Sequence, residues 1–189
     1  MRSGKPRNEG LTVMLDKGMT ISDIEQLLYI AGEHIDYAKL GWCTALVTNH
    51  LKEKVSVYKN AGIPVFFGGT LFEYYYYRKE LAAYDELIQQ YGFCNVEISD
   101  GTVPMSYEDK ISLISRYSKD FQVFSEVGSK YVENYITPRD WVRFISTDLE
   151  HGASYVITES REMGKGGICR ADGELRFGLI DEIASYIDQ

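Results

Sequence analysis

Apolar stretches of strand length alternate along the chain with longer amphipathic segments. Six short apolar runs predict strands: LTVML (11–15), YAKLGW (37–42), IPVFFGG (63–69), VEISDG (96–101), QVFSEVG (122–128) and SYVITES (154–160). Between these runs, apolar residues recur every three or four positions, which is the period of a helix with one buried face. The pattern therefore predicts six successive βα units.

Polar residues at characteristic positions predict where several helices begin. Ser22 and Glu25 have the spacing of a capping box in the first helix. Ser106 is expected to cap the helix after VEISDG, and Thr137, followed directly by proline, to cap the helix after QVFSEVG. The segment from Leu71 to Tyr91 is expected to form one long helix.

Near-continuous apolar strands joined by helices are typical of a parallel sheet covered by helices. Two α/β folds have this pattern, an open doubly wound sheet and a TIM (β/α)8-type barrel, and the pattern alone does not choose between them. DKGM follows the first strand in place of a glycine-rich dinucleotide fingerprint, which weakens the nucleotide-binding form of the open sheet. We expect residues 1–189 to form a single domain.

Composition excludes several classes of partner. Of the 189 residues, 44% are hydrophobic, and the formal charge of -8 argues against nucleic acid or an anionic membrane surface as a partner. A local cluster of lysines and arginines can still bind small anions.

The three cysteines form no CxxC pair, and no histidine lies near another ligand type at metal spacing, which disfavours a zinc site and a His-dependent triad. No apolar run has membrane-spanning length and the first residues lack a secretory h-region, so we expect a cytoplasmic protein with no membrane partner.

Every predicted strand ends on polar residues. In parallel α/β folds the carboxyl ends of the strands form one rim, and functional groups gather there. The acids on this rim would be Asp16, Glu97, Asp100, Glu126, Glu159 and Glu162, and the bases would be Lys17, Lys39, Lys130 and Arg161. Gly68 and Gly69 would let the backbone approach a ligand closely.

Some of these residues have a purely structural explanation, and others do not. Asp100 suits a turn before glycine, and Lys17 and Lys130 are the kind of residue that is often only solvated. Lys39 lies inside an apolar strand, where an unpaired charge would cost several kcal/mol.

Three acids, Glu97, Glu126 and Glu159, raise the same problem as Lys39, since residues that should be buried flank each of them. Four such residues at equivalent places predict a shared polar cavity. A mixed cluster of acids and lysines suits a divalent cation together with an anionic substrate.

Six fragments of the chain closely resemble the phosphosulfolactate synthase family: GLTVMLDKG, IDYAKLGW, GIPVFFGGTLFE, VEISDGTVPM, FSEVGSK and YVITESREMGKGGI. The resemblance runs from about Lys5 to the end of the chain. It implies a TIM barrel that catalyses the Mg²⁺-dependent addition of sulfite to phosphoenolpyruvate, giving (2R)-phospho-3-sulfolactate. We also expect a homo-oligomer.

The resemblance also implies roles for the residues of the rim. Lys130 would be the acid that protonates the carbon bearing the phosphate, and Lys39, Lys17 and Arg161 would neutralise the two anionic reactants. The expected metal-binding or lysine-orienting carboxylates are Glu97, Glu126, Glu159 and Asp16. The expected substrate-binding residues are Lys17, Gly68, Gly69, Thr70 and Ser99.

The chain departs from the family pattern in two ways. Cys43 stands where the family tends to have the second glycine of GWGTS, and Met163 stands within a segment that is EARESG in the family. Family members also continue for two further βα units, so only six units of the barrel are expected in this chain.

Two other functions remain open. One is a non-catalytic or truncated family member that acts through protein association, and the other is a Schiff-base aldolase on the same barrel. The common aldolase arrangement has its lysine on the sixth strand, and YVITES contains none.

Overall fold

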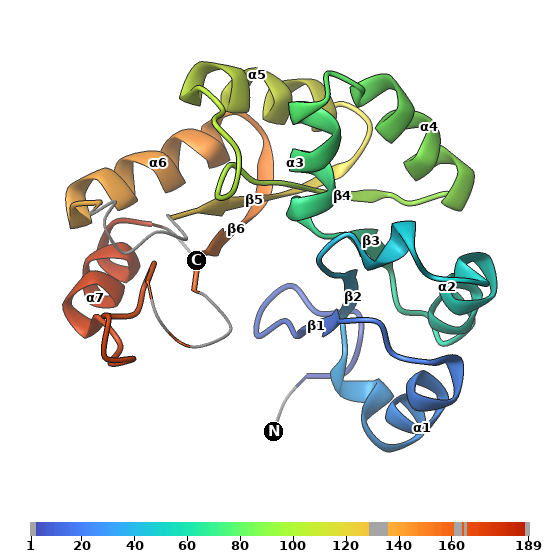
Figure 1. The fold of residues 1–189 in the computed structure, drawn as a ribbon. Coiled ribbons are helices and arrows are strands. Elements are labelled where there is room, and N and C mark those ends of the chain that lie inside the picture. The colour runs from blue at the N-terminus through green and yellow to red at the C-terminus, as the bar shows by residue number, and fades with distance from the viewer. Residues whose placement is uncertain (1–2, 129–135, 161–163, 165, 188–189) are drawn as a thin grey trace. The chain divides into compact units, whose positions relative to one another are not determined.

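Strands and helices alternate along the chain in the order that the sequence predicts (Figure 1). The computed structural model describes residues 3–128, 136–160, 164 and 166–187. The chain forms two compact units, Met1–Val96 and Glu97–Gln189. Its strands form two parallel three-stranded sheets, in the orders β1-β2-β3 and β4-β5-β6.

The first unit contains the sheet β1-β2-β3. Its strands are β1 (Val13–Asp16), β2 (Tyr37–Leu40) and β3 (Val65–Phe67), and its α-helices are α1 (Ile21–Ala31), α2 (Leu51–Asn60), α3 (Gly69–Tyr77) and α4 (Leu81–Tyr91). Two short 3-10 helices, η1 (Gly32–His34) and η2 (Thr44–Leu46), lie on either side of β2 in the sequence. Each strand is parallel to its neighbour, with Leu15 opposite Lys39 and Lys39 opposite Phe66. All the carboxyl ends of this sheet therefore lie along one edge.

The second unit contains the sheet β4-β5-β6. Strand β4 (Asn95–Ile98) begins at the end of the first unit, and β5 (Gln122–Val127) and β6 (Ala153–Thr158) follow. The helices are α5 (Tyr107–Tyr117), α6 (Pro138–Glu150) and α7 (Phe177–Tyr186). Strands β5 and β6 are parallel, with Glu126 opposite Ile157 and a register irregularity near the start of β5.

Two of the predicted helix boundaries are wrong. The capping box of α1 is formed by Thr20 and Asp23 instead of Ser22 and Glu25, because Thr20 has the extended backbone of an N-cap and its side chain accepts a hydrogen bond from the Asp23 amide. The predicted helix from Leu71 to Tyr91 is two helices, α3 and α4, separated by residues 78–80. Lys79 there has a φ of 60°, which no α-helix accommodates.

The other predicted caps are confirmed. Ser106 accepts a hydrogen bond from the Asp109 amide at the start of α5, and Thr137 caps α6 with Pro138 in its first turn.

Separate apolar contacts stabilise each unit. In the first unit, the ring of Phe67 contacts those of Tyr84, Tyr91 and Phe93 on and after α4. In the second unit, Val127 on β5 packs with Trp141 and Ile145 of α6 and with Leu179 of α7. Because Val127 faces these helices, its neighbour Glu126 points to the opposite face of the sheet.

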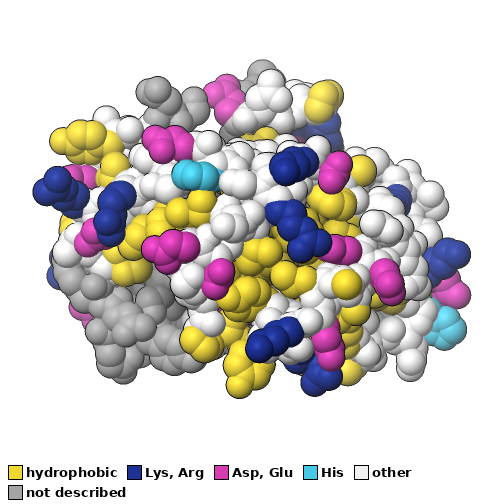
Figure 2. Space-filling model, turned by 90° about the horizontal axis from the view of Figure 1, so that it is seen from above, with side chains coloured by type: hydrophobic (Ala, Val, Ile, Leu, Met, Phe, Trp, Pro, Cys, Tyr) yellow, Lys and Arg dark blue, Asp and Glu magenta, His cyan; other side chains and the backbone are white. Residues whose placement is uncertain are grey.

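On the face shown in Figure 2, positively and negatively charged side chains are interspersed among apolar ones. Neither positive nor negative side chains dominate the described part of this face. In the part of the chain that the structure describes, no helix combines the length and the apolar character needed to cross a membrane.

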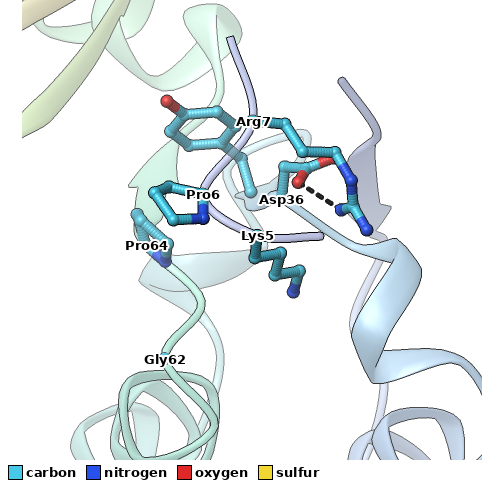
Figure 3. A pocket seen from close by; sticks show the side chains of 7 residues that line it. Lys5, Pro6, Arg7, Asp36, Gly62 and Pro64 are labelled. Atoms are coloured by element: carbon cyan, nitrogen blue, oxygen red, sulfur yellow. Dashed lines mark hydrogen bonds and ion pairs between the residues drawn. The ribbon is translucent and has the colours of Figure 1, made fainter. Parts of the chain in front are cut away.

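A cavity of about 330 Å³ lies in the first unit, at the amino ends of β2 and β3 (Figure 3). The ion pair between Arg7 and Asp36 forms part of its wall, with a distance of 2.7 Å between Nη1 and Oδ1. The side chains of Arg7 and Asp36 are only 4% and 6% exposed. Asp36 also accepts a hydrogen bond from the Thr12 amide, so this pair joins the first residues of the chain to the start of β2.

Replacing Arg7 with methionine should destabilise the first unit by about 3–5 kcal/mol, because it leaves the buried Asp36 carboxylate without its cation. Arg143→Met is the matched control, since its pair with Asp140 is largely exposed, at 64% and 39%, and should contribute at most about 1 kcal/mol. Urea denaturation of both variants measures the difference. Equal, small losses would contradict a stabilising role for the Arg7 pair.

Candidate functional site

Asp16, at the carboxyl end of β1, has a fully buried carboxylate surrounded by hydrogen-bond donors. Its Oδ1 accepts from Lys54 Nζ at 2.8 Å and from the amides of Gly18 and Met19, and its Oδ2 accepts from the Tyr58 hydroxyl at 2.8 Å. Burial and the hydrogen bond to Asp16 raise the pKa of Tyr58, which therefore stays protonated and donates. These four bonds fix the turn after β1, and metal binding by Asp16 stays a prediction.

Lys39 projects from β2 beside the turn after β3. A Cβ atom on Gly68 would lie 3.4 Å from Cγ of Lys39 and 3.2 Å from the carbonyl oxygen of Leu40, so the glycine makes room for the lysine stem. Helix α3 begins at Gly69, and Gly68 is its N-cap. The structure thus brings Lys39, Gly68, Gly69 and Thr70 together at the carboxyl ends of β2 and β3.

Lys17 lies next to an aromatic side chain at the same edge of this sheet. Its Nζ is 5.1 Å from the ring centroid of Trp42, which is half exposed. Trp42 and Cys43 both have left-handed backbone, with φ of 51° and 60°. Glycine adopts this conformation freely, so Cys43 is strained where the family pattern has glycine. Burial raises the pKa of the Cys43 thiol, and the charge of Glu73 adds to this.

In the second unit, the three predicted acids all lie at strand ends and are all buried. Glu97 is the penultimate residue of β4, Glu126 is the penultimate residue of β5, and Glu159 directly follows β6. They are 2%, 7% and 6% exposed. Ser99, which follows β4, is fully buried. The structure therefore brings Glu97, Ser99, Glu126 and Glu159 to the carboxyl ends of one sheet.

The backbone on both sides holds Glu159 in place. Its amide donates to the carbonyl of Val127, and its carbonyl accepts from the amide of Ile168. Gly128 and Gly167 make this possible, because a Cβ at Gly128 would lie 2.7 Å from the Glu159 Cβ and one at Gly167 would overlap the Glu159 carbonyl oxygen.

The sequence did not reveal a buried lysine at the centre of the second unit. Lys110 of α5 is 2% exposed and donates to the carbonyl oxygen of Glu126 at 2.6 Å. Its Nζ also lies 3.2 Å from Asp148 Oδ2 and 3.4 Å from Asp100 Oδ1. The Tyr107 hydroxyl donates to the other oxygen of Asp148 at 3.3 Å.

Four almost fully buried charged residues were missed: Lys54, Glu73, Lys110 and Asp148. A sequence signal existed for the two lysines, because each stands on the apolar stripe of its helix. Lys54 lies at helical spacing between Leu51 and Tyr58, both of which are buried.

Three of the residues predicted to lie on the rim, Lys130, Arg161 and Glu162, are outside the described residues. Within the described ranges, no group of three or more Asp, Glu, His and Cys side chains could hold a metal ion.

The fold and the buried charges at its strand ends define an α/β protein of the class whose active sites form at the carboxyl ends of parallel strands. The sequence model of the (2R)-phospho-3-sulfolactate synthase (ComA) family matches residues 1–189. The chain therefore belongs to this family of lyase-type enzymes, which confirms the resemblance seen in the sequence.

Individual relatives agree with the family assignment. The chain is 40% identical over 187 residues to a phosphosulfolactate synthase of Bacillus subtilis (strain 168), covering 98% of this chain and 74% of that protein. It is also 40% identical over 186 residues to a phosphosulfolactate synthase of Methanocaldococcus jannaschii, covering 95% of this chain and 74% of that protein.

Solved structures show the fold alone. Rhizobium etli pyruvate carboxylase T882A matches with a TM-score of 0.58 and 11% identity, over 94% of this chain and 19% of that chain. A 3-hexulose-6-phosphate synthase matches with a TM-score of 0.54 and 13% identity, over 91% of this chain and 74% of that chain.

Gly167→Ala should destabilise the second unit by at least about 2 kcal/mol, because the new methyl group meets the Glu159 carbonyl and the residue has a φ of +57°. Gly178→Ala is the control: no atom lies within 4 Å of its Cβ position in α7, so alanine should be neutral or stabilising. Thermal unfolding compares them. An unchanged melting temperature for Gly167→Ala would refute the close packing around Glu159.

Stability should fall as pH rises from about 10 towards 12. Burial and the nearby Asp148 raise the pKa of Tyr107 to about 12, whereas the unfolded chain releases this proton near pH 10. The folded state is therefore favoured fully below pH 10, and this advantage disappears as pH passes through 12.

Tyr107→Phe should make the alkaline loss of stability less steep. Urea denaturation at pH 9, 10 and 11 tests this, with Tyr29→Phe as the control because Tyr29 is 93% exposed. The interpretation fails if both variants keep the wild-type slope.

Proposed function

We propose that this chain adds sulfite to phosphoenolpyruvate and forms (2R)-phospho-3-sulfolactate. The observation that carries the proposal is the pair of buried carboxylates, Glu97 and Glu126, at the penultimate positions of neighbouring parallel strands in a member of this family. The fold itself does not require buried acids at such positions, since burying apolar residues there would cost less free energy than burying carboxylates.

Glu97 and Glu126 fit a magnesium ion. Magnesium prefers oxygen ligands and is usually held by one or two carboxylates, with waters and substrate oxygens completing the octahedron. Two carboxylates from the second unit are therefore sufficient. When bound, the ion would stabilise the negative charge that develops on the substrate carboxylate, as a Lewis acid.

Other residues would bind the anionic reactants. Ser99 is buried directly after β4, where its hydroxyl could donate to a substrate oxygen. Taken by itself, the first unit has features that suit an anion: the cationic side chains of Lys17 and Lys39 at strand ends, and the backbone amides and helix dipole at the amino end of α3, at Gly69.

The reaction forms a C–S bond and a C–H bond, and it breaks one π bond and the bond between the transferred proton and its acid. The sulfur lone pair of sulfite attacks the methylene carbon of phosphoenolpyruvate, and the π electrons move toward the carbon that bears the phosphate and onto the carboxylate. That carbon then takes a proton from an acid of the protein. We assign the acid to Lys130 from the family resemblance.

We further propose that the strands belong to a TIM (β/α)8-type barrel. Strands β1 and β6 are terminal strands of their sheets, and their apolar residues Leu15, Val156 and Ile157 are only half-buried. Half-buried apolar terminal strands are expected where further strands pair alongside. The repeated βα units and the folds of the structural relatives support the same architecture.

Phosphoenolpyruvate loss should depend on both sulfite and Mg²⁺. Glu126→Gln should lower kcat/KM by about 100-fold or more, since losing even a group that orients a metal ligand costs about 10- to 100-fold. Glu108→Gln, which changes an exposed acid on α5, is the control and should keep wild-type activity. The assay follows phosphoenolpyruvate by its ultraviolet absorbance.

Two results would count against the proposal. Folded wild-type protein that consumes no phosphoenolpyruvate with sulfite and Mg²⁺ would sink the function. Full activity in Glu126→Gln would remove Glu126 from the site.

A further inference from the structure

We propose that Lys110 is a positioning residue: it fixes the carboxyl ends of β4 and β5 so that Glu97 and Glu126 bind one divalent cation. This inference rests on the proposed function, because it concerns the same carboxylates. In its proposed role, Lys110 contacts neither the reactants nor the ion.

The contacts of Lys110 lead to both strand ends. Its shortest contact, 2.6 Å, is to the main-chain carbonyl of Glu126, the residue whose carboxylate is proposed to bind the cation. Its ion pair with Asp100 reaches the turn two residues beyond the end of β4. One ammonium group therefore restrains the backbone at two neighbouring strand ends.

A buried anchor holds the lysine from the helix side. Asp148 of α6 is fully buried, lies 3.2 Å from Lys110 Nζ, and accepts a hydrogen bond from Tyr107. The Tyr107 hydroxyl shares its single hydrogen between Asp148 and the carbonyl oxygen of Phe144 on α6, which lies 3.2 Å away. The ammonium group is thus held between α6 and the sheet, and it has little freedom to move away from Glu126.

The geometry distinguishes positioning from simple charge balance. If Lys110 served only to neutralise Asp148, it would need no bond to the Glu126 carbonyl, yet that bond is its shortest. Groups that orient metal ligands typically change metal affinity by about 10- to 100-fold when removed.

The double variant Lys110→Met/Asp148→Asn tests the proposal, because it removes both fully buried charges and takes the lysine away only from the more exposed Asp100. Mn²⁺ is the probe, and its binding to the full chain is titrated by electron paramagnetic resonance without substrate. Affinity should fall about 10- to 100-fold at a temperature where the variant is folded. Steady-state kinetics on the same samples should show kcat/KM falling with it.

Two single variants serve as comparisons. Asp148→Asn removes the anchor on α6 but keeps the Lys110 bond to Glu126, so it should lose stability and should lose less Mn²⁺ affinity than the double variant. Arg7→Met removes a buried cation at the amino end of the first sheet, and it should likewise lose stability without a change in affinity.

The outcomes separate this proposal from the proposed function. If the wild type is active and the folded double variant binds Mn²⁺ as tightly as the wild type does, the role of Lys110 is overturned and the proposed function is unaffected. If the double variant does not fold, the polar pair Lys110→Gln/Asp148→Asn decides: reduced Mn²⁺ affinity in this folded variant supports the proposal, and wild-type affinity overturns it. A folded wild type that neither binds Mn²⁺ nor turns over refutes both.

Discussion

Each unit of this protein depends on a lysine that extends from a helix to the carboxyl end of a parallel sheet. Lys54 reaches Asp16 at the end of β1, and Lys110 reaches Glu126 near the end of β5 and Asp100 in the turn after β4. A buried ammonium group without partners would cost several kcal/mol, so the turns must stay where their oxygen atoms can accept. The arrangement of the strand ends follows from this electrostatic requirement.

The same requirement explains why acids can be buried at these ends. Apolar contacts, such as those of Val127 with Trp141, fix the helices against one face of the second sheet. The opposite face of β5 then carries Glu126, in a strand whose position the Lys110 bond restrains. Packing and charge therefore act on different faces of the same strand.

The sequence predicts the α/β class and the order of the strands well because strand and helix periods are local properties. All six strands and the caps at Ser106 and Thr137 appear where the pattern places them. The break between α3 and α4 was not predicted, because Lys79 has a positive φ and a lysine side chain gives no indication of that conformation. The buried positions of Glu97, Glu126 and Glu159 follow from their apolar neighbours. The ion pairs of Lys54 and Lys110 were not predicted. The sequence shows that each lysine stands on the apolar stripe of its helix, but only the tertiary structure determines which carboxylate it contacts.

The most direct measurement is the position of Mn²⁺ in crystals of the protein grown with phosphoenolpyruvate, located by anomalous scattering. We expect one strong peak within coordination distance of carboxylate oxygens of both Glu97 and Glu126. A peak coordinated by neither residue, with phosphoenolpyruvate bound, would contradict the claim that these buried acids form the metal site.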